Sequence, residues 1–338
     1  MAGGEFDLIR RHFTRAAPAG MLGVGDDCAL LAPSAEATAV STDLLVEGRH
    51  FFPDVDPRAL GHKSLAVNLS DLAAMGAKPT AFVLGLALPR VDDAWLSAFA
   101  GGLFALADAQ GCPLVGGDTT RSDAGTTLSI TIFGTVPAQA ALRRSGARPG
   151  DDLWVSGTLG DADLALRLLL GEPEVPVADR AAVLAVTRRA LEWPEPRVAL
   201  GLALRGLASA AIDISDGLLQ DVGHVLAASG CGARLCADDV PVSSAVAALP
   251  AGWRRRCALG GGDAYELCFT APPEARARVA EAAARAGVAV TRIGTAQAGA
   301  GLHVVDADGT PVPDLPRAGF DHFPPAAGPA AGHLPETS

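Results

Sequence analysis

The chain has 338 residues, of which 49% are apolar and 19% are charged, and its formal net charge is −11 at pH 7. This length and apolar content predict two domains with sizeable cores, while the acidic balance and the lack of Lys/Arg runs exclude nucleic acid as a bulk partner. No uninterrupted apolar run is long enough to cross a membrane, and six scattered cysteines without a Cys-x-x-Cys pair predict reduced thiols in a cytoplasmic protein.

The first half of the chain predicts a mixture of strands and helices. Strands are predicted at residues 37–43, 80–88 and 126–136, and helices at about 57–75 and 93–110. The first strand ends in an acidic residue, Asp43. The second helix ends at Gly111, which is a typical helix stop.

The helix predicted at residues 57–75 carries two kinds of face. Leu65, Leu69 and Leu72 recur with helical spacing and predict a core stripe. Asn68 and Asp71 project together from another face. This pair is equally typical of a solvated surface and of a polar site, and the helix pattern alone leaves both interpretations open.

A polar, turn-rich segment at residues 143–152 predicts the domain boundary. We therefore expect an N-terminal domain at 1–140 and a C-terminal layered α/β domain at 150–323. The second domain is predicted from strands near 153–157, 210–214, 232–237, 267–270 and 289–294, which alternate with helices near 161–170, 178–191, 196–207, 216–230 and 273–286. Residues 324–338, rich in Pro, Ala and Gly, are expected to be disordered.

Aspartates recur in short patches beside glycine or hydroxyl residues. The patches are Gly23-Val24-Gly25-Asp26-Asp27, Ser41-Thr42-Asp43, Asn68-Leu69-Ser70-Asp71, Gly116-Gly117-Asp118-Thr119, Asp213-Ile214-Ser215-Asp216-Gly217 and, more weakly, Gly261-Gly262-Asp263. Any one of them is more often a turn or a helix cap than a ligand. Together they supply the oxygen donors that Mg²⁺ prefers, with glycines that let backbone approach phosphate. The patches therefore predict a magnesium-dependent enzyme of phosphoryl chemistry.

Common phosphate-binding motifs do not fit the sequence. Gly61-His62-Lys63-Ser64 resembles the end of a P-loop, but it lacks the glycine before the lysine and the upstream glycine spacing. The kinase His-Arg-Asp and Asp-Phe-Gly motifs are also missing. His50 has two open interpretations, a half-buried loop histidine or a substrate contact.

The patches, taken together, resemble the thiamine-monophosphate kinase family of the aminoimidazole ribonucleotide synthetase-like superfamily. The residues that carry the resemblance are Gly25-Asp26-Asp27-Cys28, Ser41-Thr42-Asp43, Glu47-Gly48-Arg49-His50-Phe51, the block from Ala66 to Ala77, Gly116-Gly117-Asp118-Thr119 and Asp213-Ile214-Ser215-Asp216-Gly217. The resemblance implies an N-terminal sheet domain that forms a barrel across a homodimer. It also implies a C-terminal α/β domain, with ATP and several Mg²⁺ ions between the two.

The resemblance also implies roles for individual residues. Implied magnesium ligands are Asp27, Ser41, Thr42, Asp43, Asp71, Asp118, Asp213 and Asp216; implied ATP contacts are Gly117, Asp118, Arg144 and Ser215; implied substrate contacts are His50, Asp263, Glu266 and Phe320. Asp71, Asp118 and Asp216 are expected to be the most critical. The family usually has Gly-Gly-Glu-Asp-Tyr-Glu-Leu where this chain has Asp263 and Ala264, so the substrate contact there is expected at Asp263 first and at Glu266 second.

The reaction implied is phosphorylation of thiamine monophosphate by ATP to give thiamine diphosphate, the last step of thiamine diphosphate biosynthesis. The attacking phosphate oxygen is already ionised near neutral pH, so no general base is expected. Three alternatives remain: a related ATP-dependent synthetase of the same superfamily, a non-catalytic regulator that binds magnesium and nucleotide, and a magnesium phosphatase that would release phosphate from thiamine monophosphate without ATP.

Overall fold

The structure is a computed structural model that describes residues 5–24 and 28–315. The tail expected to be disordered, residues 324–338, lies outside the described residues. Within the described ranges, no helix has the length and apolar character needed to span a membrane.

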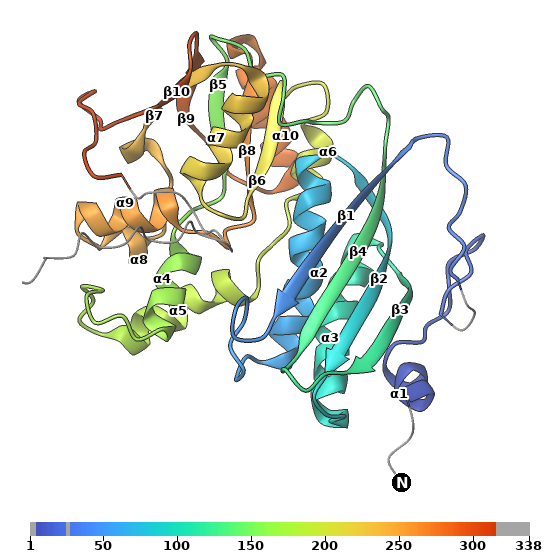
Figure 1. The fold of residues 1–338 in the computed structure, drawn as a ribbon. Coiled ribbons are helices and arrows are strands. Elements are labelled where there is room, and N and C mark those ends of the chain that lie inside the picture. Colours follow the sequence, from blue (N-terminus) through green and yellow to red (C-terminus); the bar gives the residue numbers. More distant parts are fainter. Residues whose placement is uncertain (1–4, 25–27, 316–338) are drawn as a thin grey trace, which may run out of the picture.

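The first half of the chain forms a four-stranded sheet with helices on one face, as Figure 1 shows. The strands are β1 (Ala37–Val46), β2 (Lys78–Leu88), β3 (Leu114–Arg121) and β4 (Thr127–Val136), in the order β1-β4-β2-β3, with only β2 and β3 parallel. The helices are α1 (Glu5–His12), α2 (Pro57–Ala74) and α3 (Asp93–Gln110). The sheet is open at β1 and β3, so the described part of one chain contains no closed barrel.

The two helices predicted in this half are confirmed, and local sequence explains their ends. Helix α2 begins at Pro57, where the Asp56 carboxylate accepts the amide hydrogen of Arg58. Helix α3 ends at Gly111, whose φ of 60° places it in the left-handed region that favours glycine. Proline at the start and glycine at the end thus fix these boundaries.

Helix α2 is buried on almost every side because it packs against α3, the first sheet and elements of the second half. The stripe of Leu65, Leu69 and Leu72 is confirmed as core. Asn68 is buried as well: its side-chain amide donates to the Ser64 carbonyl, and its carbonyl accepts the Asp43 amide at 3.2 Å. Of the two interpretations of this polar face, the solvated surface is therefore wrong for Asn68.

The second half forms a six-stranded sheet in the order β10-β7-β9-β5-β8-β6, with only β10 and β7 parallel. Its strands are β5 (Asp152–Ser156), β6 (Ala210–Ile214), β7 (Gly232–Cys236), β8 (Glu266–Ala271), β9 (Val290–Gln297) and β10 (Gly301–Val305). Its helices are α4 (Asp161–Leu169), α5 (Arg180–Glu192), α6 (Val198–Ala203), α7 (Leu218–Ser229), α8 (Ser244–Ala247), α9 (Ala251–Gly260) and α10 (Arg276–Ala286), with short 3₁₀ turns η1 (Ala237–Asp239) and η2 (Pro273–Ala275).

Several predictions about element boundaries were wrong. Strand β1 does not end at Asp43 but continues to Val46, because Leu44 and Leu45 extend its pairing with β4. Residues 116–119 lie outside the three strands predicted in this half, but they are part of β3, an edge strand whose glycines and polar residues hide its pattern. Strand β10 and helices α1, α8 and α9 were not predicted.

Glycines allow α2 and α3 to pack backbone against backbone. A Cβ atom on Gly102 of α3 would lie 1.9 Å from the Arg58 carbonyl oxygen, and one on Gly61 of α2 would lie 2.0 Å from the Phe99 carbonyl oxygen. A Cβ on the neighbouring Gly101 would meet nothing within 4 Å. The two adjacent glycines of α3 therefore differ only in what they face.

We predict that Gly102→Ala lowers the free energy of unfolding by at least about 2 kcal/mol, because two helix backbones must separate. Gly101→Ala is the matched control, and we expect it to raise stability by about 0.5–1 kcal/mol through the helix propensity of alanine. Urea denaturation of the two variants beside the parent protein measures both values. Equal stabilities would contradict the close approach of α2 and α3.

Candidate active site

A cavity of about 990 Å³ lies between the two halves of the molecule. Its walls come from β1 and the segment 48–55 that follows it, from α2, α4 and α5, and from the turns after β6 and α9. Carboxylates occupy one part: Asp43, Asp71, Asp213, Asp216 and Asp263. Apolar side chains such as Val55, Leu60, Leu166 and Leu191 line another. The cavity can therefore hold a ligand with both an anionic or cation-bridged end and an apolar end.

Strand β1 and helix α2 bring two of the predicted aspartates together. Alternation along β1 directs Ser41 and Asp43 toward α2, and the Ser41 hydroxyl donates a short hydrogen bond to the Asp71 carboxylate. Asn68 lies one helical turn before Asp71 on α2. Its side-chain oxygen accepts a hydrogen bond from the Asp43 amide and so fixes the backbone of β1 beside Asp71. The buried polar face of α2 thus organises this part of the cavity.

Strand β6 and the turn after it add two more carboxylates to the same cavity. The Ser70 hydroxyl of α2 donates to Asp213 at 2.7 Å, which ties β6 to the helix. Asp216 follows in the turn, and its carboxylate accepts a hydrogen bond from the side-chain amide of Gln220 at 3.2 Å.

Asp221, which sequence reasoning missed, is buried and accepts the backbone amide hydrogens of Asp216 and Gly217 at 3.2 and 3.1 Å. Its position within the first turn of α7 was the available signal, because a carboxylate there caps exposed amides.

Burial and mutual repulsion raise the pKa of these carboxyl groups. Burial, and then repulsion from Asp71, raise the pKa of Asp43 to about 7. The pKa of Asp213 also rises to about 7, first through burial and then through repulsion from Asp71. Burial raises the pKa of Asp71, although its Ser41 hydrogen bond and the charge of Arg144 oppose the rise. Burial and repulsion therefore oppose the ionisation of Asp43 and Asp213, and added positive charge would favour it.

Donor chemistry here fits hard cations rather than zinc. The convergent groups are carboxylate and hydroxyl oxygens, and the carboxylates repel one another unless positive charge is added. In the described ranges, no group of three or more His, Cys, Asp or Glu side chains is already arranged to hold an ion. These carboxylates therefore suit Mg²⁺, which uses one or two protein carboxylates and completes its shell with water and phosphate.

The structure does not bring Asp118 into this group. Strands β4 and β2 separate β3 from β1, and the strand register aligns Asp118 with Gly85, Ser129 and Leu44 on the sheet face away from α2 and α3. Asp43, by contrast, faces α2. The neighbouring Gly117 lies against β2, where a Cβ atom would be 2.0 Å from the Leu84 carbonyl oxygen.

Other predicted contacts lie in different surroundings. The hydroxyl of Thr42 lies 2.6 Å from that of Thr131 on β4, one residue out of phase with Asp43. His50 lines the cavity, and its Nδ1 accepts the Val46 amide hydrogen at 3.0 Å. Ser215 also lines the cavity, whereas Arg144 is exposed and acts on Asp71 through its charge.

The predicted residues Asp27 and Phe320 lie outside the described residues.

Lys63 lies in the cavity, although its motif is not a P-loop. Its Nζ is 3.0 Å from Oδ1 of Asp263, and its side chain is only 5% exposed. The Tyr265 hydroxyl donates to the same oxygen at 3.0 Å. The signal that was available is that Lys63 and Lys78 are the only lysines in the chain. The segment is part of α2 and not a P-loop, as predicted, but it does supply a cation to the cavity.

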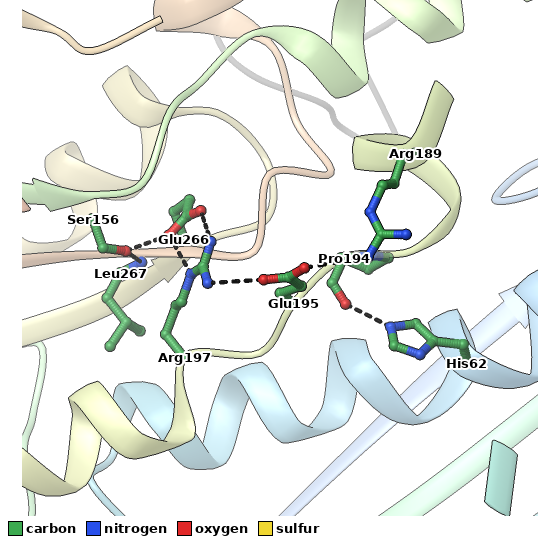
Figure 2. A network of polar contacts seen from close by, with 8 residues as sticks. All are labelled: His62, Ser156, Arg189, Pro194, Glu195, Arg197, Glu266 and Leu267. Carbon is green, nitrogen blue, oxygen red and sulfur yellow. Dashed lines mark hydrogen bonds and ion pairs between the residues drawn. The ribbon is translucent and has the colours of Figure 1, made fainter. Parts of the chain in front are cut away.

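Glu266, the second predicted substrate contact, has a different environment from Asp263. It is 5% exposed and is not among the residues that line the cavity. Figure 2 shows its carboxylate between Arg197 and Ser156. Two neighbouring acids of one motif thus face opposite ways, one toward the cavity and one toward a buried arginine.

Comparisons with known proteins agree with this architecture. The chain matches the family of AIR synthase related proteins, through its N-terminal domain at residues 25–136 and its C-terminal domain at 148–307. It is 48% identical to the thiamine-monophosphate kinase of Salmonella typhimurium, over 96% of this chain and 99% of that protein. It also resembles the crystal structure of the Stenotrophomonas maltophilia thiamine-monophosphate kinase (45% identity, TM-score 0.80, 91% and 96% of the two chains covered). A third similar structure is AaThiL complexed with AMPPCP and TMP (28% identity, TM-score 0.72, 95% and 97% covered).

The raised pKa values predict how stability depends on pH in the metal-free protein. Between the ordinary Asp pKa of 3.8 and about 7, the folded protein holds protons on Asp43 and Asp213 that the unfolded chain has lost. The free energy of unfolding should therefore fall as pH rises through this window, by at most about 1.4 kcal/mol per pH unit for each group. Urea unfolding in the presence of a chelator, at several pH values, measures the slope.

Asp213→Asn should make this pH dependence shallower, because one buried titrating group is removed. Asp123→Asn changes an acid whose side chain is 90% exposed and should leave the slope unchanged. A slope that is identical in all three proteins would rule out the buried-charge explanation.

Proposed function

This chain belongs to the thiamine-monophosphate kinase family of AIR synthase related proteins, and we propose that it transfers the terminal phosphate of ATP directly to thiamine monophosphate. The observation that carries the proposal is the cavity that gathers Asp43, Asp71 and Asp213 beside an apolar wall. Carboxylates suit cation-bridged phosphates, and the apolar wall suits the rings of thiamine. The product is thiamine diphosphate, and the reaction completes its biosynthesis.

We further propose that Asp27, Ser41, Thr42, Asp43, Asp71, Asp118, Asp213 and Asp216 are the magnesium ligands. Support is strongest for Asp43 and Asp213, because burial and repulsion from Asp71 oppose their ionisation and a bound cation would favour it. When bound, magnesium ions would neutralise the phosphates of both substrates and hold them in line. The carboxylates of α2 and β6 are held by Ser41 and Ser70, so they need little reorganisation.

The residues of the chain contribute mainly position and charge to the reaction. The acceptor is a phosphate oxygen that is already ionised at neutral pH, so no side chain has to remove its proton. Lys63 and Asp263 lie at the cavity wall, where Asp263 and His50 are proposed to contact thiamine monophosphate. Gly117, Arg144 and Ser215 are proposed to contact ATP, and Arg144 brings positive charge toward Asp71.

We propose a homodimer in which two N-terminal sheets pair through their bare faces. Val40 on this face of β1 is 57% exposed. In Figure 1 no helix of the described chain covers this face of the sheet. Asp118 shares the face, so the dimer would bring it near the sheet of the partner subunit. In this arrangement residues 1–140 bind metal and nucleotide and form the dimer, and residues 150–323 form the second domain.

We predict that the protein forms thiamine diphosphate and ADP from thiamine monophosphate and ATP, only when Mg²⁺ is present. Asp71→Asn should lower turnover at least about 100-fold, as for loss of a major electrostatic element. Asp123→Asn is the exposed control and should keep full activity. A coupled ADP-release assay with a magnesium titration measures these rates.

The same assay, together with measurements of phosphate release and of nucleotide binding, separates the alternatives. Turnover of aminoimidazole precursors without turnover of thiamine monophosphate would indicate a synthetase. Release of inorganic phosphate without ATP would indicate a phosphatase. Binding of nucleotide without any turnover would indicate a regulator.

If the dimer forms through the bare sheet face, a charge placed on that face should weaken self-association. Val40→Asp should weaken self-association at least about tenfold, because a charge would be buried at the interface. Val186 on α5 is 67% exposed, and Val186→Asp is the control that should leave association unchanged. Sedimentation equilibrium measures the dissociation constants. A parent protein that is monomeric at micromolar concentration would refute the dimer.

A further inference from the structure

The segment 261–265, which presents Asp263 to the cavity, has an unusual backbone. Asp263 and Tyr265 have φ values of 59° and 50°, in the left-handed region that side-chain-bearing residues rarely adopt. Their amides donate to the carbonyls of Ser215 and Ile214 at 2.8 Å each. Such a conformation persists only where the surrounding structure holds it from several sides. The segment therefore needs an anchor at the end where it enters β8.

Glu266 provides that anchor. It directly follows Tyr265, and its carboxylate accepts a forked pair of hydrogen bonds from Arg197, at 2.7 Å from Nε and 2.5 Å from Nη2. The Ser156 hydroxyl donates to the same carboxylate at 2.5 Å and accepts the Leu267 amide hydrogen at 2.9 Å. Both ionic side chains are largely buried. Planar arginine forks fix the orientation of a carboxylate more strictly than a single hydrogen bond does.

Residues around Glu266 leave room for its carboxylate and bind its arginine partner. Gly157 has a φ of 58°, and a Cβ atom there would lie 2.0 Å from Oε1 of Glu266. Glu195 lies on the other side of Arg197, with its Oε2 at 3.4 Å from Nη1. Any side chain larger than hydrogen at residue 157 would therefore displace the Glu266 carboxylate.

The anchor is also connected to α2, as Figure 2 shows. Nε2 of His62 lies 2.8 Å from the Pro194 carbonyl oxygen, and its ring packs 4.9 Å from that of Trp193. The next residue on the helix is Lys63, which pairs with Asp263 across the cavity. The contacts therefore close a ring: from α2 through the segment 193–197 to Glu266, then along 265–263, and back to α2.

We propose that Arg197 is a positioning residue for thiamine monophosphate: by holding Glu266, it fixes the segment 261–265 and places Asp263 opposite Lys63. In this proposal Glu266 pairs with Arg197 in the interior, and Asp263 is the acid that contacts the substrate. The inference rests on the proposed function, because it names the substrate that Asp263 and Lys63 receive. It assigns ATP no direct contact with this segment, which meets the proposed ATP contact Ser215 only through the Ser215 backbone carbonyl. Loss of Arg197 should therefore weaken the binding of thiamine monophosphate more than the binding of ATP.

Steady-state kinetics of Arg197→Met test this role. We expect the KM for thiamine monophosphate to rise about tenfold while the KM for ATP changes less than about twofold. Arg197→Lys should recover part of the loss, since lysine keeps the charge but not the fork. Arg276→Met is the matched control: Arg276 makes the same forked pair with buried Asp152, at 2.6 and 2.8 Å, at the start of β5. It should leave both KM values unchanged.

A double-mutant cycle separates positioning from direct contact. If Arg197 acts through Glu266, then Arg197→Met, Glu266→Gln and the double variant should raise the KM to the same extent. If Glu266 contacts the substrate itself, Glu266→Gln should raise the KM more than Arg197→Met does. Equal losses for both substrates in folded Arg197→Met, or no change in either KM, would overturn the proposal.

Hydrogen–deuterium exchange gives a readout that does not depend on turnover. Amides of residues 261–265 should exchange at least about tenfold faster in Arg197→Met than in the parent, and not in Arg276→Met. If Arg197→Met does not fold, Arg197→Lys and Glu266→Gln carry the same comparison. Unchanged exchange in folded variants refutes the positioning role. A parent protein that forms no thiamine diphosphate refutes the proposed function, and the exchange result still decides whether Arg197 holds the segment.

Discussion

Burial of α2 on nearly all sides is the constraint on which the site depends. Both sheets contact this helix, so each polar residue on it needs a partner inside the protein. Asn68 holds the backbone of β1, Ser70 holds Asp213, and Lys63 holds Asp263. One helix thereby determines how strands from the two halves face each other across the cavity. Loss of its close fit against α3 would disturb all of these contacts together.

The molecule buries carboxylates in two different ways, and the difference separates structure from chemistry. Glu266 is neutralised by the arginine fork of Arg197 and by the Ser156 hydroxyl. Asp43 and Asp213 face other carboxylates, and burial raises their pKa to about 7. A buried acid that already has its cation adds rigidity, whereas acids that repel one another create an electrostatic demand for an external cation. Negative charge that costs stability in the free protein is thus what makes the site suited to cation-bridged phosphates.

Sequence patterns predicted much of this site, and the misses have physical causes. The proline and glycine at the ends of α2 and α3 act locally, so these helices were predicted within a residue or two. Strand β3 was missed because its glycines and polar residues do not alternate, and its conformation depends on pairing with β2. Lys63 was set aside because its loop motif failed. Its position in the cavity comes from the packing of α2, which a local motif does not report.

The sequence by itself determined the residue types of the chemistry: oxygen ligands without zinc-type clusters, small residues beside them, and a resemblance that runs through most of the chain. Only the tertiary structure decided which acid faces which partner. Asp43 and Asp118 look alike in sequence, yet the strand register places them on opposite faces of one sheet. Asp263 and Glu266 lie three positions apart, yet one meets Lys63 in the cavity and the other meets Arg197 in the interior. Charges interact through space, and residues 69 positions apart, such as Arg197 and Glu266, become neighbours only when the chain folds.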